Sequence, residues 1–149
     1  MKEPVIVDSA CLISLERINF LDLLPALFDP IIAPPEVQRE FGKTLSWLRT
    51  ETPTNQTFVA ALKMLVDFGE AEAMALAHEL GHLIILDDHQ ARAVAKNLGL
   101  RISGTVGSLV KAKQEGVITA IKPFVIALES SGFFMSKSLK EEVLRLAGE

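Results

Sequence analysis

The chain has very little cysteine, no excess of positive charge and no long apolar run. Its single cysteine, Cys11, excludes an internal disulfide and fits a reducing cytoplasm. No uninterrupted apolar run approaches the ~18 residues that a membrane-spanning helix needs. Acids interrupt the short apolar run of the N-terminal segment, which argues against a signal peptide. We therefore expect a cytoplasmic protein without a membrane segment.

The charge balance is acidic, with 15 basic against 19 acidic residues and a formal net charge of −4. Overall charge thus gives no support for nucleic-acid binding, and a nucleic-acid substrate would require local basic clusters or a bound metal ion. The hydrophobic content of 49% and charged content of 23% are typical of a soluble globular protein. With 149 residues and no internal repeat or low-complexity segment, residues 1–149 are expected to form one domain.

Short apolar runs alternate along the chain with segments of helical periodicity. Strands are expected at residues 5–7, 31–33, 83–86 and 100–103, with a possible edge strand near Trp47 inside an irregular segment, 42–56. Helices are expected at residues 10–18, 20–28, from 35 onward, 57–66, from 69 to a stop at Gly81, 89–98, 105–114, 118–129 and 139–147. Ser9 is the expected cap of the first of these helices, and Ser138 the expected cap of the last. This alternation predicts an α/β fold with a short parallel sheet covered by helices on both faces.

Six acidic residues fall near strand ends or near the start of helices: Asp8, Glu40, Glu70, Glu72, Asp87 and Asp88. The carboxyl ends of parallel strands and the first turns of the following helices lie on one edge of the sheet, where ligands bind. Clustered carboxylates repel one another unless a cation is present, and oxygen ligands suit Mg²⁺ or Mn²⁺. We therefore hypothesise a divalent metal site that could activate water for phosphodiester hydrolysis. Ordinary helix capping is the alternative explanation for Glu70, Glu72 and one of the two adjacent aspartates.

A second motif, His78-Glu79-Leu80-Gly81-His82, matches the HExxH signature of zinc peptidases. That signature requires both histidines on one face of a helix, with the glutamate as general base. Gly81 followed by an apolar run instead predicts that the helix stops, which would take His82 off that face. A zinc peptidase is therefore kept only as a remote alternative.

Five segments together resemble the PIN domain family, in particular its branch with GEAEA-type helices. Residues 5–9 (VIVDS) match a strand that ends in Asp-Ser, and residues 34–40 (PPEVQRE) match a Pro-Pro-x-Val-x-x-Glu pattern. Residues 69–77 (GEAEAMALA) match the Ala-rich helix that opens on the third acid. Residues 86–92 (LDDHQAR) and 104–116 (GTVGSLVKAKQEG) match the last two patterns. The resemblance covers nearly the whole chain and implies a three-layer PIN-like fold.

The resemblance also implies a metal-dependent ribonuclease that uses Mg²⁺ or Mn²⁺, often as the toxin of a toxin–antitoxin pair. It makes Asp8 a direct metal ligand, completed by Glu40, Glu72 and Asp88, and gives Ser9 and Thr105 supporting roles. The family spacing favours Glu72 over Glu70 and Asp88 over Asp87, but the residues alone leave both choices open. The third acid is Glu, where Asp is commoner in the family. A catalytically silent binding module on the same fold is the main alternative.

Four basic residues are candidates for contacts with RNA phosphates. Arg92 and Lys96 lie on the helix after the acidic pair, and Lys111 and Lys113 lie on the helix after the Gly-Thr turn. A solvated helix face would explain them equally well. The resemblance further implies a homodimer and a possible protein antitoxin as partners.

Overall fold

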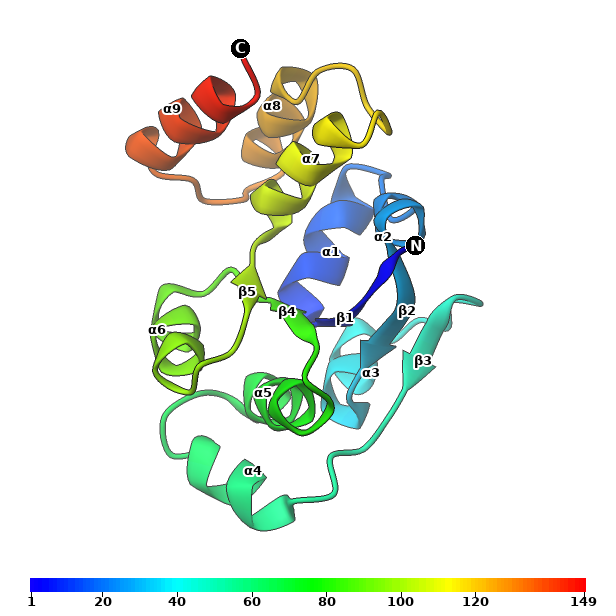
Figure 1. Cartoon of the computed structure of the whole chain (residues 1–149), viewed down its shortest axis with the longest axis vertical. Coiled ribbons are helices and arrows are strands. Elements are labelled where there is room, and N and C mark those ends of the chain that lie inside the picture. Colours follow the sequence, from blue (N-terminus) through cyan, green and yellow to red (C-terminus); the bar gives the residue numbers. More distant parts are fainter.

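A five-stranded, wholly parallel sheet forms the centre of the computed structural model, which describes residues 1–149. The strands are β1 (Glu3–Val7), β2 (Phe28–Ala33), β3 (Leu48–Thr50), β4 (Leu83–Ile85) and β5 (Ile102–Ser103). Their order across the sheet is β3-β2-β1-β4-β5, with helices on both faces (Figure 1). The predicted three-layer α/β architecture is confirmed, including the edge strand that follows Trp47.

Nine helices surround this sheet. They are α1 (Ser9–Arg17), α2 (Leu23–Leu27), α3 (Pro35–Phe41), α4 (Gln56–Leu62), α5 (Phe68–Leu80), α6 (His89–Asn97), α7 (Thr105–Gln114), α8 (Lys122–Ser130) and α9 (Lys137–Leu146). Because side chains alternate along a strand, β1 contributes to two cores. Val5 and Val7 pack with α1, α2, α7 and α8, whereas Ile6 packs with α4, α5 and α6 on the other face. None of the helices combines the length and the hydropathy that crossing a bilayer requires.

Helix α5 lies in the middle of the second core and is buried over most of its length. Residues 71–77 are all buried, and five of these seven are small or unbranched apolar residues of the Ala-rich run. Small side chains let this helix pack closely against α3, α4 and the central strands. The stretch 69–88 therefore forms the expected helix, the expected stop at Gly81, and a central strand.

Several helix ends differ from the predicted ones, and at two of them a residue other than the predicted one is the cap. Asp8, not Ser9, caps α1, since its Oδ1 accepts a hydrogen bond from the Cys11 backbone at 2.9 Å. Ser136, not Ser138, caps α9. Helix α4 ends at Leu62 rather than residue 66, and α8 begins at residue 122 rather than 118. Side-chain capping hydrogen bonds set the starts of α1 and α9, whereas α8 begins without one.

The order of the strands creates a switch point between β1 and β4. From β1 the chain adds β2 and β3 on one side, then returns to add β4 and β5 on the other. Val7 pairs with Ile85, so both strands end at the same level. Asp8 and the dipeptide Leu86-Asp87 therefore leave the sheet side by side at its carboxyl edge. In open α/β sheets this crevice is the usual place for a ligand.

Candidate functional site

Asp8 is the most deeply buried acid of the carboxyl edge, with 3% of its surface exposed. Its Oδ1 accepts the hydrogen bond that caps α1. Burial raises the pKa of Asp8 well above its usual value, and the negative charge of Asp87 adds to this effect. Glu70 and Asp67 raise it further, by smaller amounts. No basic side chain forms an ion pair with Asp8. It is thus a buried carboxyl group that faces other acids.

Asp87 follows β4 and is held by the first residue of α7. The Thr105 backbone N–H donates to Asp87 Oδ1 at 2.8 Å, and the Thr105 hydroxyl donates to Oδ2 at 2.6 Å. Burial raises the pKa of Asp87, while these hydrogen bonds and the charge of Arg92 oppose the increase. Gly104 permits this close packing, because a Cβ there would lie 3.1 Å from Asp87 Oδ1. Thr105 therefore fixes the orientation of Asp87.

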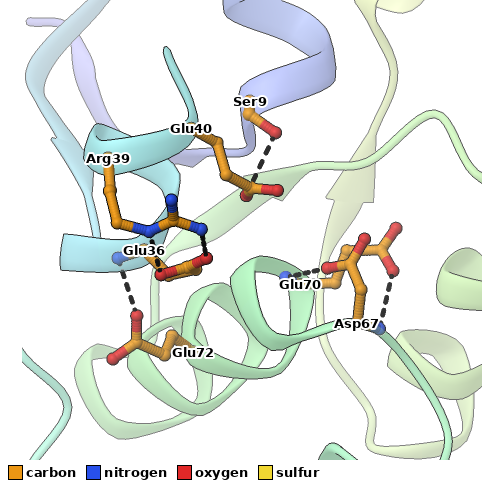
Figure 2. Close-up of polar contacts among 7 residues, drawn as sticks. All are labelled: Ser9, Glu36, Arg39, Glu40, Asp67, Glu70 and Glu72. Atoms are coloured by element: carbon orange, nitrogen blue, oxygen red, sulfur yellow. Dashed lines mark hydrogen bonds and ion pairs between the residues drawn. The ribbon is translucent and has the colours of Figure 1, made fainter. Parts of the chain in front are cut away.

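Glu40 reaches the same edge from α3, as Figure 2 shows. The Ser9 hydroxyl donates to Glu40 Oε1 at 3.4 Å. Gly69 in α5 leaves room for this carboxylate, since a Cβ at that position would collide with Glu40 Oε1. Desolvation raises the pKa of Glu40, followed by the charges of Asp67 and Glu36. The supporting role expected for Ser9 thus corresponds to a contact with Glu40.

Glu70 and Asp67 form a reciprocal capping box at the start of α5 (Figure 2). The Glu70 N–H donates to Asp67 Oδ1 at 2.8 Å, and the Asp67 N–H donates to Glu70 Oε1 at 3.3 Å. Burial, then the charge of Asp67, raises the pKa of Glu70 to about 7. Asp67 was not among the predicted site residues. Its sequence signal is the Asp-x-x-Glu spacing of a capping box before an Ala-rich run.

Glu72 has a different partner from Glu70. Residues two apart on a helix point roughly 200° apart, and Glu72 points toward the first turn of α3 (Figure 2). It is 4% exposed, and its Oε1 accepts a hydrogen bond from the Glu36 backbone N–H at 2.9 Å. This contact satisfies one free N–H in the first turn of α3. Glu70 thus lies against Asp67 and Glu72 against α3, so the two acids take different positions at the start of α5.

Asp88 is exposed and caps α6, with its Oδ2 accepting from the Ala91 N–H at 2.9 Å. Its charge contributes to the raised pKa of Glu70, so it lies at the border of the acidic group. Asp87, in contrast, interacts directly with the charge of Asp8. The geometry thus brings Asp8, Asp87, Glu70 and Glu40 to one edge and leaves Asp88 beside them.

The donor set of this edge fits a hard divalent cation. No three Asp, Glu, His or Cys side chains lie close enough together to hold one ion by themselves. Mg²⁺ commonly binds through one or two carboxylates, keeps several waters and takes its remaining ligands from substrate phosphates. Asp8 and Asp87 supply such a pair: burial raises the pKa of both, the charge of Asp87 further raises the pKa of Asp8, and a cation would offset these effects. The edge therefore suits a substrate-completed site better than an all-protein cage.

Arg92 is engaged with the protein itself. Its Nη1 donates to Leu86 O at 2.7 Å and to Ser103 O at 3.1 Å, which ties the ends of β4 and β5 together. Its charge also lowers the pKa of Asp87. These contacts give Arg92 a positioning role next to the acids, in place of the predicted phosphate contact.

The three predicted lysines do not gather at the acidic edge. Lys113 binds the chain end through Ala147 O and Glu149. Lys111 lies near Glu3 at the opposite, amino edge of the sheet. Lys96 is exposed on the last turn of α6, the end of that helix away from Asp88. They form no common basic patch with the site.

The HExxH motif serves the fold. Helix α5 ends at Leu80, and Gly81 adopts a left-handed conformation with φ 70°, so His82 lies outside the helix. The carboxylate of Glu79 accepts hydrogen bonds from the Thr54 N–H, the Thr54 hydroxyl and the Asn55 N–H at 2.9, 2.7 and 3.2 Å. These bonds lower the pKa of Glu79. Glu79 thus secures the segment before α4, and the helical zinc-site geometry is not present.

The fold and its acidic switch point define an α/β domain of the kind that binds polar ligands at the carboxyl edge of a parallel sheet. Comparison with known families refines this class. A family model described as a PIN domain matches residues 4–149, and the chain belongs to the PIN domain family. PIN domains are generally nucleases, and those nucleases usually use divalent metals. No curated protein matches the chain.

Proposed function

We propose that this chain is a ribonuclease that hydrolyses RNA phosphodiesters with the help of Mg²⁺ or Mn²⁺. One observation carries the proposal: the buried carboxylate of Asp8 and the partly buried carboxylate of Asp87 lie at the switch point of the sheet, and neither forms an ion pair with a basic side chain. Buried acids with raised pKa values are costly to the fold. Membership of a family of nucleases supports a metal-assisted reaction as the reason for their presence.

Asp8 and Asp87 would hold the ion, with Glu70 and Glu40 at its border. When bound, such an ion activates water and stabilises charge on the phosphoryl group. Thr105 keeps both oxygens of Asp87 in place, and Ser9 steadies Glu40, the most exposed acid of the four. In the reaction the water oxygen bonds to phosphorus, the bond from phosphorus to one sugar oxygen breaks, and a proton passes from water to that oxygen.

We extend the proposal to the biological role that the family resemblance implies. The chain is proposed to act in the cytoplasm as the toxin of a toxin–antitoxin pair and to form a homodimer. Light scattering over a wide concentration range tests the dimer, and a strict monomer contradicts it. A catalytically silent module on the same fold would bind RNA and leave it intact.

The test is cleavage of a mixed RNA panel by purified protein with Mg²⁺, Mn²⁺, Zn²⁺ or EDTA. Asp8→Asn is the informative variant, because Asn is as good a helix N-cap as Asp and the fold should remain. Glu72→Gln is the matched control, because Gln can still accept the hydrogen bond from Glu36. His82→Ala serves as the control for a zinc peptidase.

We expect cleavage with Mn²⁺ or Mg²⁺, none with EDTA, and none by Asp8→Asn. The Glu72→Gln and His82→Ala variants should cut like the wild type. Calorimetric titration with Mn²⁺ provides an independent reading of the site. Absence of both cleavage and Mn²⁺ binding in the wild-type protein would refute the proposed function and leave the fold unaffected.

A further inference from the structure

A cavity of about 330 Å³ lies directly beside the acidic edge. Its walls are the turn at residues 63–67 after α4, Glu70 in the first turn of α5, and Asp88 and Gln90 at the start of α6. Three acids, Asp67, Glu70 and Asp88, line it, so it shares a border with the proposed metal site. Small-ligand sites span roughly 300–1,000 Å³, and a cavity at the lower limit suits one nucleoside.

Lys63 is the one basic residue that lines this cavity. Its Nζ lies 4.3 Å from the centre of the Phe68 ring, a cation–π contact that fixes the side chain without neutralising it. No carboxylate lies within ion-pair distance of Lys63. Two other basic groups of this region already have partners, because Arg39 is paired with Glu36 and Arg92 binds carbonyl oxygens. Lys63 is therefore an available ammonium at the edge of the site.

The remaining wall offers apolar contacts and one free acceptor. Met64 and Leu65 are 86% and 54% exposed, so their apolar surface is accessible to a ligand. Gln90 Nε2 donates to Leu65 O at 2.9 Å and so holds the turn against α6. That bond uses the amide nitrogen of Gln90 and leaves its Oε1 for a ligand. An ammonium, an apolar surface and a polar acceptor are the groups that contact the phosphate, the face and the edge of a nucleotide.

We propose that this cavity is a subsite for one nucleotide of single-stranded RNA next to the scissile phosphate. Lys63 contacts the phosphate of that nucleotide, and Met64 and Leu65 contact its base. The inference rests on the proposed ribonuclease function and assigns part of its substrate binding to the turn between α4 and α5. The carboxylates on the cavity border repel a phosphate, and Lys63 is the lining group that offsets this repulsion.

The experiment measures RNA affinity in the Asp8→Asn background, where no cleavage interferes, at fixed Mg²⁺ and over a series of KCl concentrations. Lys63→Met removes the charge, Lys63→Arg restores it, and Lys137→Met is the control because Lys137 is an exposed lysine on the distant helix α9. We expect Lys63→Met to weaken binding about fivefold to tenfold at low salt. The slope of log affinity against log salt should fall by about 0.7, the value for one single-strand phosphate contact.

Restoration by Lys63→Arg, with Lys137→Met unchanged, supports the subsite, since a packing defect would not alter the salt slope. A single abasic residue moved along the RNA should reduce affinity at one position beside the cut site mapped with the wild type. Equal affinities and slopes for Lys63→Met and Lys137→Met would overturn the subsite, and so would an Asp8→Asn protein that binds no RNA. Cleavage by the wild type decides the ribonuclease function separately from either outcome.

Discussion

The Glu70→Gln substitution tests how much the negative charge of Glu70 lowers the stability of the fold, separately from the proposed role of this residue at the metal site. In the wild type Glu70 belongs to the capping box of α5, and burial together with the charge of Asp67 raises its pKa to about 7 (Figure 2). Gln can still accept the hydrogen bond from the Asp67 N–H, so the capping box is retained. The substitution therefore removes a charge and keeps the local structure.

The sign and size of the effect follow from the pKa. Between the usual value of 4.5 and the folded value of about 7, the folded chain binds more protons at Glu70 than the unfolded chain does. Stability therefore falls as pH rises through this window. The full difference corresponds to about 3 kcal/mol at pH 8. Because the side chain is only half-buried, solvent screening reduces it to about 1–2 kcal/mol, and the lost helix-dipole interaction leaves a net gain of about 1 kcal/mol for Glu70→Gln.

Chemical denaturation of metal-free protein measures this gain at pH 8 and at pH 4.5. We expect Glu70→Gln to be more stable than the wild type by about 1 kcal/mol at pH 8, or about 2–4 °C in Tm, and nearly equal at pH 4.5. Glu141→Gln, on the exposed face of α9, should change stability by less than about 0.5 kcal/mol at either pH. Mn²⁺ should stabilise the wild type more than Glu70→Gln, because the variant lacks one of the proposed border acids.

Two results would refute this reasoning. A Glu70→Gln protein that is less stable than the wild type at pH 8 would mean that the carboxylate contributes more through its contacts than it costs through repulsion. A gain that persists unchanged at pH 4.5 would show that ionisation is not its cause.

Three further substitutions test neighbouring contacts. Gly69→Ala places a Cβ where the Glu40 carboxylate lies, so it should reduce cleavage while the circular dichroism spectrum is kept; full activity would remove Glu40 from the site. Thr105→Val deletes the hydroxyl bond to Asp87 and should cost about 1–2 kcal/mol in denaturant unfolding at neutral pH, together with activity. Glu79→Gln should cut RNA normally and unfold at lower denaturant at pH 7, with a smaller difference at pH 3, because a lowered pKa adds its full stability above the usual value and loses it as pH falls through the folded value. Loss of cleavage in Glu79→Gln would revive a catalytic role for the HExxH motif.

Much of the fold could be predicted from short-range patterns. β-branched runs mark the central strands, and glycine after the Ala-rich run marks the end of α5, because these signals depend on residues within one turn or one strand. Helix starts were harder to place. Asp8 follows β1 and also caps α1. Its side chain can reach the Cys11 N–H only because the chain turns directly after the strand, and no local sequence signal predicts that orientation.

Which acid of each neighbouring pair lies at the candidate site depends on the orientation of its side chain in the fold. Glu70 and Glu72 share one helix and one chemistry, and only the packing of α5 against α3 turns one toward the edge and the other toward the Glu36 N–H. Asp87 and Asp88 divide in the same way, since the register of β4 with β1 directs the first toward Asp8 and leaves the second to cap α6.

The same packing explains why the basic residues were misplaced. A lysine on a long helix can lie at either edge of the sheet, and α7 carries Lys111 away from the acids to Glu3. Lys63 falls within the expected helix 57–66, but α4 ends at Leu62, and the turn between α4 and α5 brings Lys63 to the acidic edge because both helices pack on the same face as Ile6. In an acidic chain, the position of such a single cation relative to the carboxylates decides where a phosphate can bind. That position is set by tertiary packing, so the net charge of the chain does not determine whether its carboxyl edge can hold a phosphate.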